Sequence, residues 1–150
     1  MRLATDLIQD LASKVKDLPW VAGRCVSAMS LDDLHARVAH LPKPAIGILY
    51  EGARALPSPG GSASLGVSGE IVFSILLLVD GATLAKVIDV ATPAHGYLDD
   101  MRAAIHGGRA PTGNFWKWVI EAPATVKGTQ AVWLQRWSTP IQLTPSQRTS

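Results

Sequence analysis

Few residues of this sequence could support catalysis or metal binding, and their spacing does not bring them together. His35 and His40 are five residues apart in a segment with helical periodicity, which sets them about 140° apart around the axis, whereas helical metal pairs are spaced by about four residues. Asp99 and Asp100 are adjacent on another expected helix, so their carboxylates diverge instead of meeting on one substrate. We therefore expect neither a metal site nor an acid–base pair here.

The single cysteine and the glycine-rich segments also lack the partners that their chemistry requires. Cys25 can form neither an internal disulfide nor a zinc-binding spacing, and no sequence neighbour marks it as activated, so we expect an inert, partly buried thiol. The segment Ser58-Pro59-Gly60-Gly61-Ser62 has no following Lys-Ser or Lys-Thr pair and opens no helix, so it lacks the parts of a phosphate-binding loop. The sequence thus predicts no catalytic residue, no cofactor and no metal. A small enzyme or ligand-binding domain is a minority alternative.

The tryptophans are the more informative side chains. Trp116 and Trp118 alternate on one expected strand, and Trp133 and Trp137 share a face of the last one, which predicts one or two aromatic patches on neighbouring strands. Core packing and interface contact both stay open, because tryptophan serves in cores and is enriched, with arginine, at interfaces. The candidate interface residues are Trp116, Trp118, Trp133, Arg136 and Trp137, with Ser58, Gly60, Gly61 and Ser62 of the Gly/Ser-rich segment.

A sheet must position these side chains, and its centre is the apolar run from Ile71 to Val79. The run holds one polar residue, Ser74, and falls far short of the roughly 20 residues that a membrane-spanning helix needs, so we expect a strand. Side chains alternate along a strand, so both faces of this one are apolar. Leaving Val72, Leu76 and Leu78 in water would forfeit about 5 to 9 kcal/mol, a large share of a typical domain's stability. We expect helices of the same chain or another subunit to cover the second face.

The other periodicities place helices before and after this strand. The expected helices cover residues 3–18, 31–41 and 93–105, and the other expected strands cover residues 24–29, 45–52, 115–122 and 130–141. Ser30 and Thr92 are the expected amino-terminal caps of the second and third helices. The apolar residues expected to be buried by the second helix are Leu31, Leu34, Val38 and Leu41.

Two stretches have no clear helical or strand pattern. Residues 55–69 are so rich in Gly, Pro and Ser that we expect a flexible loop, and residues 82–91 are expected to be helix or irregular structure. The sequence thus predicts an α+β fold, a mostly antiparallel mixed sheet of about four to five strands packed against two to three helices. We expect one domain over residues 1–143 and a polar tail over 144–150.

Composition and charge agree with one ordinary domain. The chain has 150 residues, and 47% of them are hydrophobic. This is enough to form the core of one domain, but the chain is too short for two domains that each have a full core. Its 14 basic and 12 acidic residues give a net charge of +2 and are scattered, which disfavours a nucleic-acid-binding protein. Without a signal peptide pattern or paired cysteines, a reducing cytoplasm is the expected compartment.

In order and length, these parts resemble the tail terminator proteins of long-tailed bacteriophages, the Mu-like tail completion family. The resemblance runs from Leu3 to Ile141 and is carried by two N-terminal helices followed by PAIGILYEG, EIVFSILLLV, YLDDMRAAIHG, FWKW and VWLQRWSTPI. It implies a structural virion protein without an active site, one subunit of a ring that is hexameric in that family. Such a ring caps the head-proximal end of the tail tube, ends tube polymerisation and provides the head–tail joining surface.

The resemblance also implies partners and a location. The partners are further copies of the chain, the tail tube protein and a neck or head-completion protein, with no membrane and no sequence-specific nucleic acid. The location is the head-proximal end of the virion tail, after assembly in the host cytoplasm. The loop over residues 55–69 is then expected to order on contact with tube or neck. A head–tail connector or neck completion protein is the nearest alternative.

Overall fold

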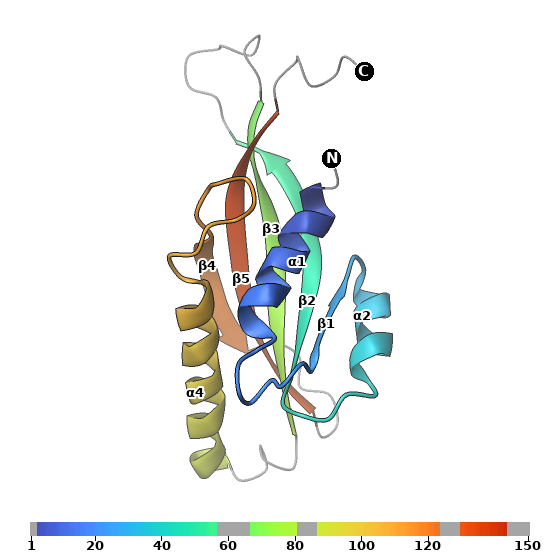
Figure 1. Ribbon diagram of the computed structural model, residues 1–150. Helices are drawn as coiled ribbons and strands as arrows, with labels where there is room; N and C mark the ends of the chain where they lie inside the picture. Colours follow the sequence, from blue (N-terminus) through green and yellow to red (C-terminus); the bar gives the residue numbers. More distant parts are fainter. Residues whose placement is uncertain (1–2, 57–66, 81–86, 124–129, 144–150) are drawn as a thin grey trace.

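The computed structural model describes residues 3–56, 67–80, 87–123 and 130–143, which form three helices and one five-stranded sheet (Figure 1). The helices are α1 (Leu3–Val15), α2 (Leu31–Val38) and α4 (Val87–Ile105). The strands are β1 (Cys25–Ala28), β2 (Ala45–Ala55), β3 (Val67–Asp80), β4 (Lys117–Pro123) and β5 (Gln130–Leu143). This is the single-domain α+β fold that the sequence predicts.

The apolar run lies at the centre of the sheet, in β3. The strand order is β1-β2-β3-β5-β4, and β1 pairs with β2 in parallel while every other pair is antiparallel. β1 and β4 are therefore the two edges. Ile71, Phe73 and Ile75 point towards what we call the first face, and Ser74 and Leu76 towards the second face.

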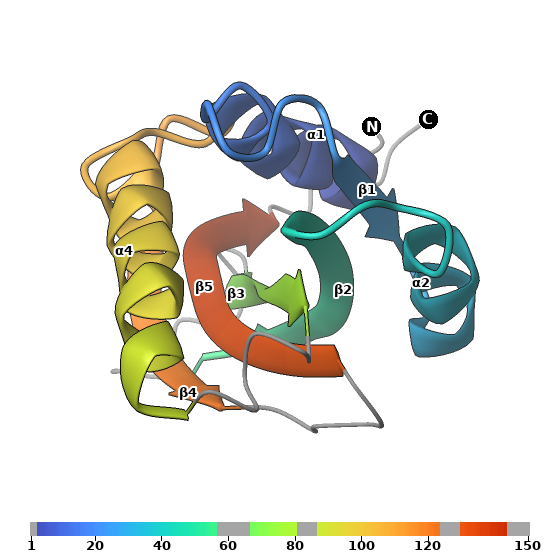
Figure 2. The same cartoon turned by 90° about the horizontal axis from the view of Figure 1, so that it is seen from below.

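Two helices cover the first face. α1 lies over β1 and β2, and α4 lies beside it over β5 and β4 (Figures 1 and 2). The core between helices and sheet contains Leu7 and Leu11 of α1, Leu98, Met101 and Ile105 of α4, and Ile46, Ile48, Phe73, Ile75, Leu77 and Trp137 of the sheet. The apolar side chains of α1 and α4 thus face the core.

The second face is covered at one end by α2 of the same chain. Leu34 and Val38 of α2 pack against Leu78, and Leu76 is partly buried beside them. Val72, farther along β3, is half-buried. Within the described residues, α2 therefore supplies part of the cover that the second face of the apolar run requires.

Several element boundaries differ from the predicted ones. α2 ends at Val38, before the expected residue 41, and Leu31 is 53% exposed instead of buried. The helix has only about two turns, and its Leu34–Val38 stripe sits over β1 and β2, so its first residue lies outside that contact. α1 likewise ends at Val15, although Leu18 still packs partly against the core.

The start of α4 is the largest correction. The helix begins at Val87, so Thr92 is not its cap and Pro93 lies inside it. A proline within a helix removes one backbone hydrogen bond, and the rest of a long helix can tolerate this loss. The end is as predicted, since Gly107 follows with a φ of 76°, a conformation that glycine adopts without strain.

The strands beside the Gly/Ser-rich segment are longer than expected. β2 reaches Ala55 and β3 begins at Val67, so both ends of the stretch expected as loop over residues 55–69 belong to strands. Residues 57–66 lie outside the described residues, as do the expected tail, 144–150, and the turn at 124–129. Within the part of the chain that the structure describes, no helix has the length and apolar character needed to cross a membrane.

Candidate functional site

The candidate interface tryptophans divide into core and surface residues. Trp137 is completely buried and Trp116 is 3% exposed, whereas Trp118 is 49% exposed. Trp133 is partly buried against the first-face core. Only Trp118 of these four therefore offers a large aromatic surface to a partner.

Hydrogen bonds explain how the two buried indoles are held. Trp137 donates through Nε1 to the side-chain oxygen of Gln135, at 3.2 Å, and Trp116 donates to the carboxylate of Asp10 in α1, at 2.8 Å. The ring of Trp116 also meets that of Phe73 edge to face, with centroids 5.9 Å apart. Trp116 thus links α1 to the segment before β4 and to β3, whereas the hydrogen bond of Trp137 joins two residues of β5.

The other predicted interface residues are not gathered around Trp137. Arg136 is half-buried and pairs with Ser74 of β3, so it points towards the second face, whereas Trp137 points towards the first. Adjacent residues in a strand point to opposite faces, so Arg136 and Trp137 are neighbours in the sequence but do not share a surface. Ser58, Gly60, Gly61 and Ser62 lie outside the described residues.

Four large apolar side chains gather at the β4 edge of the sheet, and we call them the β4 patch. They are Phe115, Trp118, Val119 and Ile120, each between 44% and 52% exposed. Trp118 lies beside Arg102 of α4, whose guanidinium is 5.8 Å from the ring centre, and Phe115 lies under Arg109 at 4.3 Å. Exposed apolar clusters of this kind on a small domain often mark binding surfaces.

A shallow hollow adjoins the β4 patch. Its volume is about 280 Å³, and Arg102, Ala103 and His106 of α4 line it together with Trp118 and Trp137. The hollow extends the patch from the edge of the sheet towards α4.

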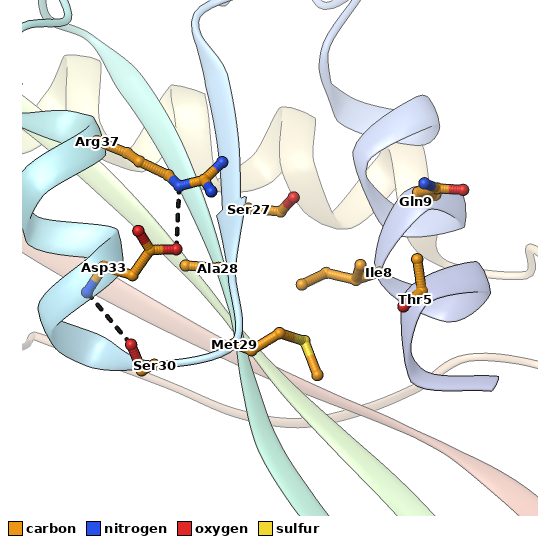
Figure 3. Close-up of a pocket in the computed structure, with 9 residues that line it drawn as sticks. All are labelled: Thr5, Ile8, Gln9, Ser27, Ala28, Met29, Ser30, Asp33 and Arg37. Atoms are coloured by element: carbon orange, nitrogen blue, oxygen red, sulfur yellow. Dashed lines mark hydrogen bonds and ion pairs between the residues drawn. The ribbon is translucent and has the colours of Figure 1, made fainter. Parts of the chain in front are cut away.

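A groove lies at the opposite edge of the sheet, along β1, and we call it the edge groove. Its volume is about 410 Å³, and β1 forms its floor between α1 and α2 (Figure 3). The lining residues are Thr5, Ile8 and Gln9 of α1, Ser27 and Ala28 of β1, Met29 and Ser30 of the following turn, and Asp33 and Arg37 of α2.

The polar residues of the edge groove are held by local contacts. Ser30 caps α2, as predicted, because its hydroxyl accepts from the amide of Asp33. The Asp33 carboxylate accepts from Nε of Arg37 at 3.0 Å (Figure 3). Among the described residues that line the groove, none is a histidine or a cysteine, so these residues form no nucleophile–base pair of the kind that uses either type.

Cys25 lies at the other end of β1, partly buried against the first-face core. Burial raises the pKa of its thiol to about 11, and the nearby positive charge of Lys16 opposes that shift. The thiol is therefore neutral at ordinary pH. Among the described residues, no group of three or more His, Cys, Asp or Glu side chains is arranged to hold a metal ion.

Sequence reasoning did not single out most of this surface. Val119, Ile120 and Met29 were not predicted to be interface residues. Trp118, Val119 and Ile120 are nevertheless three consecutive apolar residues, so that both faces of this short strand carry apolar side chains. The same test that marked Ile71 to Val79 could have marked this run. Which strand lies at an edge is set by the sheet order, and this is why only the fold shows the run to be exposed.

No family model matches this chain, and no curated protein matches it. Among solved structures, it is similar to a chain in a structure described as "Virion of native gene transfer agent (GTA) particle". The sequence identity is 12%, the TM-score is 0.58, and the match covers 94% of this chain and 98% of that chain. The two chains therefore share a fold over nearly their whole lengths.

Proposed function

We propose that this chain is a structural protein of a phage-like virion. The observation that carries the proposal is the likeness of fold to a chain of a gene transfer agent virion, which includes almost every residue of both chains. A likeness of this extent concerns the whole domain and not one recurring motif. The β4 patch adds support, because a subunit that works by assembly needs an exposed apolar surface.

Within the virion, the role we propose is that of a tail terminator. Subunits would form a ring, on the family's pattern a hexamer, that caps the head-proximal end of the tail tube and presents a joining surface to the neck. The element order in the sequence supports this role, as does the presence of two different surfaces, the β4 patch and the edge groove. A closed ring requires two such surfaces on each subunit. The mechanism is matching of shapes, without a catalytic step.

The test combines a mass measurement with a binding assay. Size-exclusion chromatography with light scattering should give one closed oligomer of the 15.9 kDa chain, and negative-stain microscopy should show rings. Added to purified tail tubes of its phage, the protein should bind at one end and stop further growth. A protein that stays monomeric at high concentration and also in the presence of tubes would rule out the tail terminator role.

The same materials separate the role from its alternatives. A head–tail connector or neck completion protein would bind the portal side of filled heads and leave the tube ends free. A ligand-binding domain would instead show a rise in melting temperature with a small molecule, in proportion to ln(1 + [L]/Kd). Either result would contradict the tail terminator role and support the corresponding alternative.

A further inference from the structure

We propose that the β4 patch of one copy docks in the edge groove of the next copy, so that subunits join through the two opposite edges of their sheets. This inference rests on the proposed ring-forming function and names the surfaces that would form the ring.

The β4 patch presents apolar side chains on both faces of an edge strand. Trp118 pairs with Trp137 and so lies on the first face, whereas Ile120 pairs with Arg136 and lies on the second. Val119 sits at the bulge between them. Charged residues, proline and bulges discourage pairing at an edge strand, and β4 has Lys117, Glu121, Pro123 and a bulge. Its middle residues Trp118, Val119 and Ile120 are nevertheless apolar and exposed.

The edge groove has the complementary shape. Its floor is the other outer strand, β1, and its two walls are α1 on the first face and α2 on the second (Figure 3). Side chains on both faces of an inserted strand would therefore each meet a wall. Ile8, Ala28 and Met29 supply apolar contacts, and Met29 is 52% exposed in the single chain.

The size of the groove suits more than one side chain. At about 410 Å³ it falls within the roughly 300 to 1,000 Å³ of pockets that enclose drug-sized ligands. A tryptophan and one aliphatic neighbour form a group of comparable size. Trp118 is the natural anchor, because tryptophan is among the residues that contribute most to protein interfaces.

At the groove, Arg37 and Asp33 form an ion pair with each other, and the charges beside the two surfaces that have no ion pair among the described residues are of opposite sign. The first turn of α2, beside the groove, carries Asp32 and Asp33, and Asp32 is exposed with no ion pair among the described residues. Next to the patch, Lys117 is exposed and likewise makes no ion pair in the described part of the chain, and Arg109 contacts the ring of Phe115 and the carbonyl of Gly113 but no carboxylate there. Docking would bring these charges closer together.

The placement of the surfaces decides the kind of assembly. They lie at opposite edges of one sheet, so they cannot meet within a copy, and a dimer made by one contact leaves one patch and one groove open. Only a head-to-tail series that closes on itself uses both surfaces of every copy. In a closed ring, the groove of every copy holds the β4 patch of its neighbour, and this arrangement therefore leaves no apolar edge exposed.

The test uses one variant for each surface and a matched control. Trp118→Glu blocks the patch, Met29→Glu blocks the groove, and Leu31→Glu changes an equally exposed leucine of α2 that does not line the groove. Circular dichroism checks that each variant is folded, and light scattering gives its mass. We expect Leu31→Glu to form the wild-type oligomer, and each of the other two to weaken assembly at least about thirtyfold.

Mixing the two blocked variants tests that the surfaces meet each other. Each variant keeps the surface that the other lacks, so an equimolar mixture should form dimers and nothing larger. A mixture that remains monomeric would show that the groove does not receive the patch and serves another partner, such as a strand of a tube or neck protein. Oligomerisation of both variants at wild-type strength would also overturn the inference.

A cross-linking experiment does not depend on glutamate being tolerated. In a Cys25→Ser background, Val119→Cys and Met29→Cys together should give a ladder of disulfide-linked copies on oxidation, and neither cysteine alone should do so. The interface is refuted, and the tail terminator role left intact, if the wild-type protein forms a ring, the two glutamate variants form it as well, and the double-cysteine variant gives no ladder. A wild-type protein that is monomeric even with tail tubes refutes the role itself.

Discussion

At the scale of single residues, buried polar side chains hold the helices on the sheet. Gln135 is completely buried in β5, and its amide donates to the backbone carbonyl of Leu98 in α4, at 3.0 Å, and to Glu121 in β4, at 2.7 Å. Its oxygen accepts from Trp137. Glu121 also binds Arg102 of α4 at 2.8 Å. One amide therefore connects a helix and two strands.

We predict that Gln135→Leu destabilises the protein by about 2 to 4 kcal/mol, because the Trp137 N–H and the Leu98 carbonyl would lose their partner in the core. The change keeps the approximate size of the side chain, so the loss reports hydrogen bonds more than volume. Urea unfolding followed by tryptophan fluorescence measures it. Gln142→Leu, at an exposed position of the same strand, should change stability by less than about 0.5 kcal/mol. Equal effects of the two changes would contradict this role.

The thiol of Cys25 provides a second prediction at this scale. Since burial raises its pKa to about 11, the native protein should react with iodoacetamide at least about a hundredfold more slowly than the urea-unfolded chain at pH 8. The native rate should rise about tenfold per pH unit up to pH 10, because the thiolate fraction does. The pKa of the thiol is higher in the folded than in the unfolded chain, so the stability contributed by the neutral thiol is lost as pH rises from about 9 towards 11. Fast labelling of the native protein at pH 8 would disprove the burial.

At the scale of elements, two glycines test how closely the strands approach. A Cβ on Gly69 in β3 would lie 2.7 Å from the backbone oxygen of Arg54 in β2, whereas a Cβ on Gly96 in α4 meets nothing within 4 Å. We predict that Gly69→Ala destabilises the protein by about 1 to 3 kcal/mol through this clash. Gly96→Ala should instead stabilise it by about 0.5 to 1 kcal/mol, because alanine loses less entropy in a helix. Thermal unfolding gives the melting temperature of each variant. Changes of the same sign in the two melting temperatures would contradict the packing described for β2 and β3.

At the scale of the whole molecule, the proposed assembly should be held mainly by apolar contact. We predict that the melting temperature of the wild-type chain rises with protein concentration, because association stabilises the folded state by mass action. The oligomer should persist at about 1 M salt, where the screening length falls to about 3 Å and exposed charge pairs contribute little. Trp118→Glu should abolish the concentration dependence. Dissociation of the wild-type oligomer by salt alone would indicate that charges, and not the β4 patch, hold it.

Much of this protein was determined by the sequence alone. The one-domain α+β fold, the central strand with two apolar faces and the Ser30 cap all follow from residue patterns that act over short distances. Their boundaries were less predictable, because the ends of helices and strands depend on what packs against them. Leu31 is exposed because it lies outside the contact that α2 makes with the sheet, and α4 begins before the expected residue, so that Pro93 lies inside it.

Only the tertiary structure decided which residues reach the surface. Trp116 and Trp118 differ by two positions, yet one is buried against Phe73 and the other lies at an open edge. The edge groove likewise joins α1, β1 and α2, which no local pattern places side by side. The strand order puts β1 and β4 at the two edges, and that order is fixed by pairings between segments far apart in the chain. Exposure is a property of the assembled sheet, and this is why the sequence could name the tryptophans but not assign their roles.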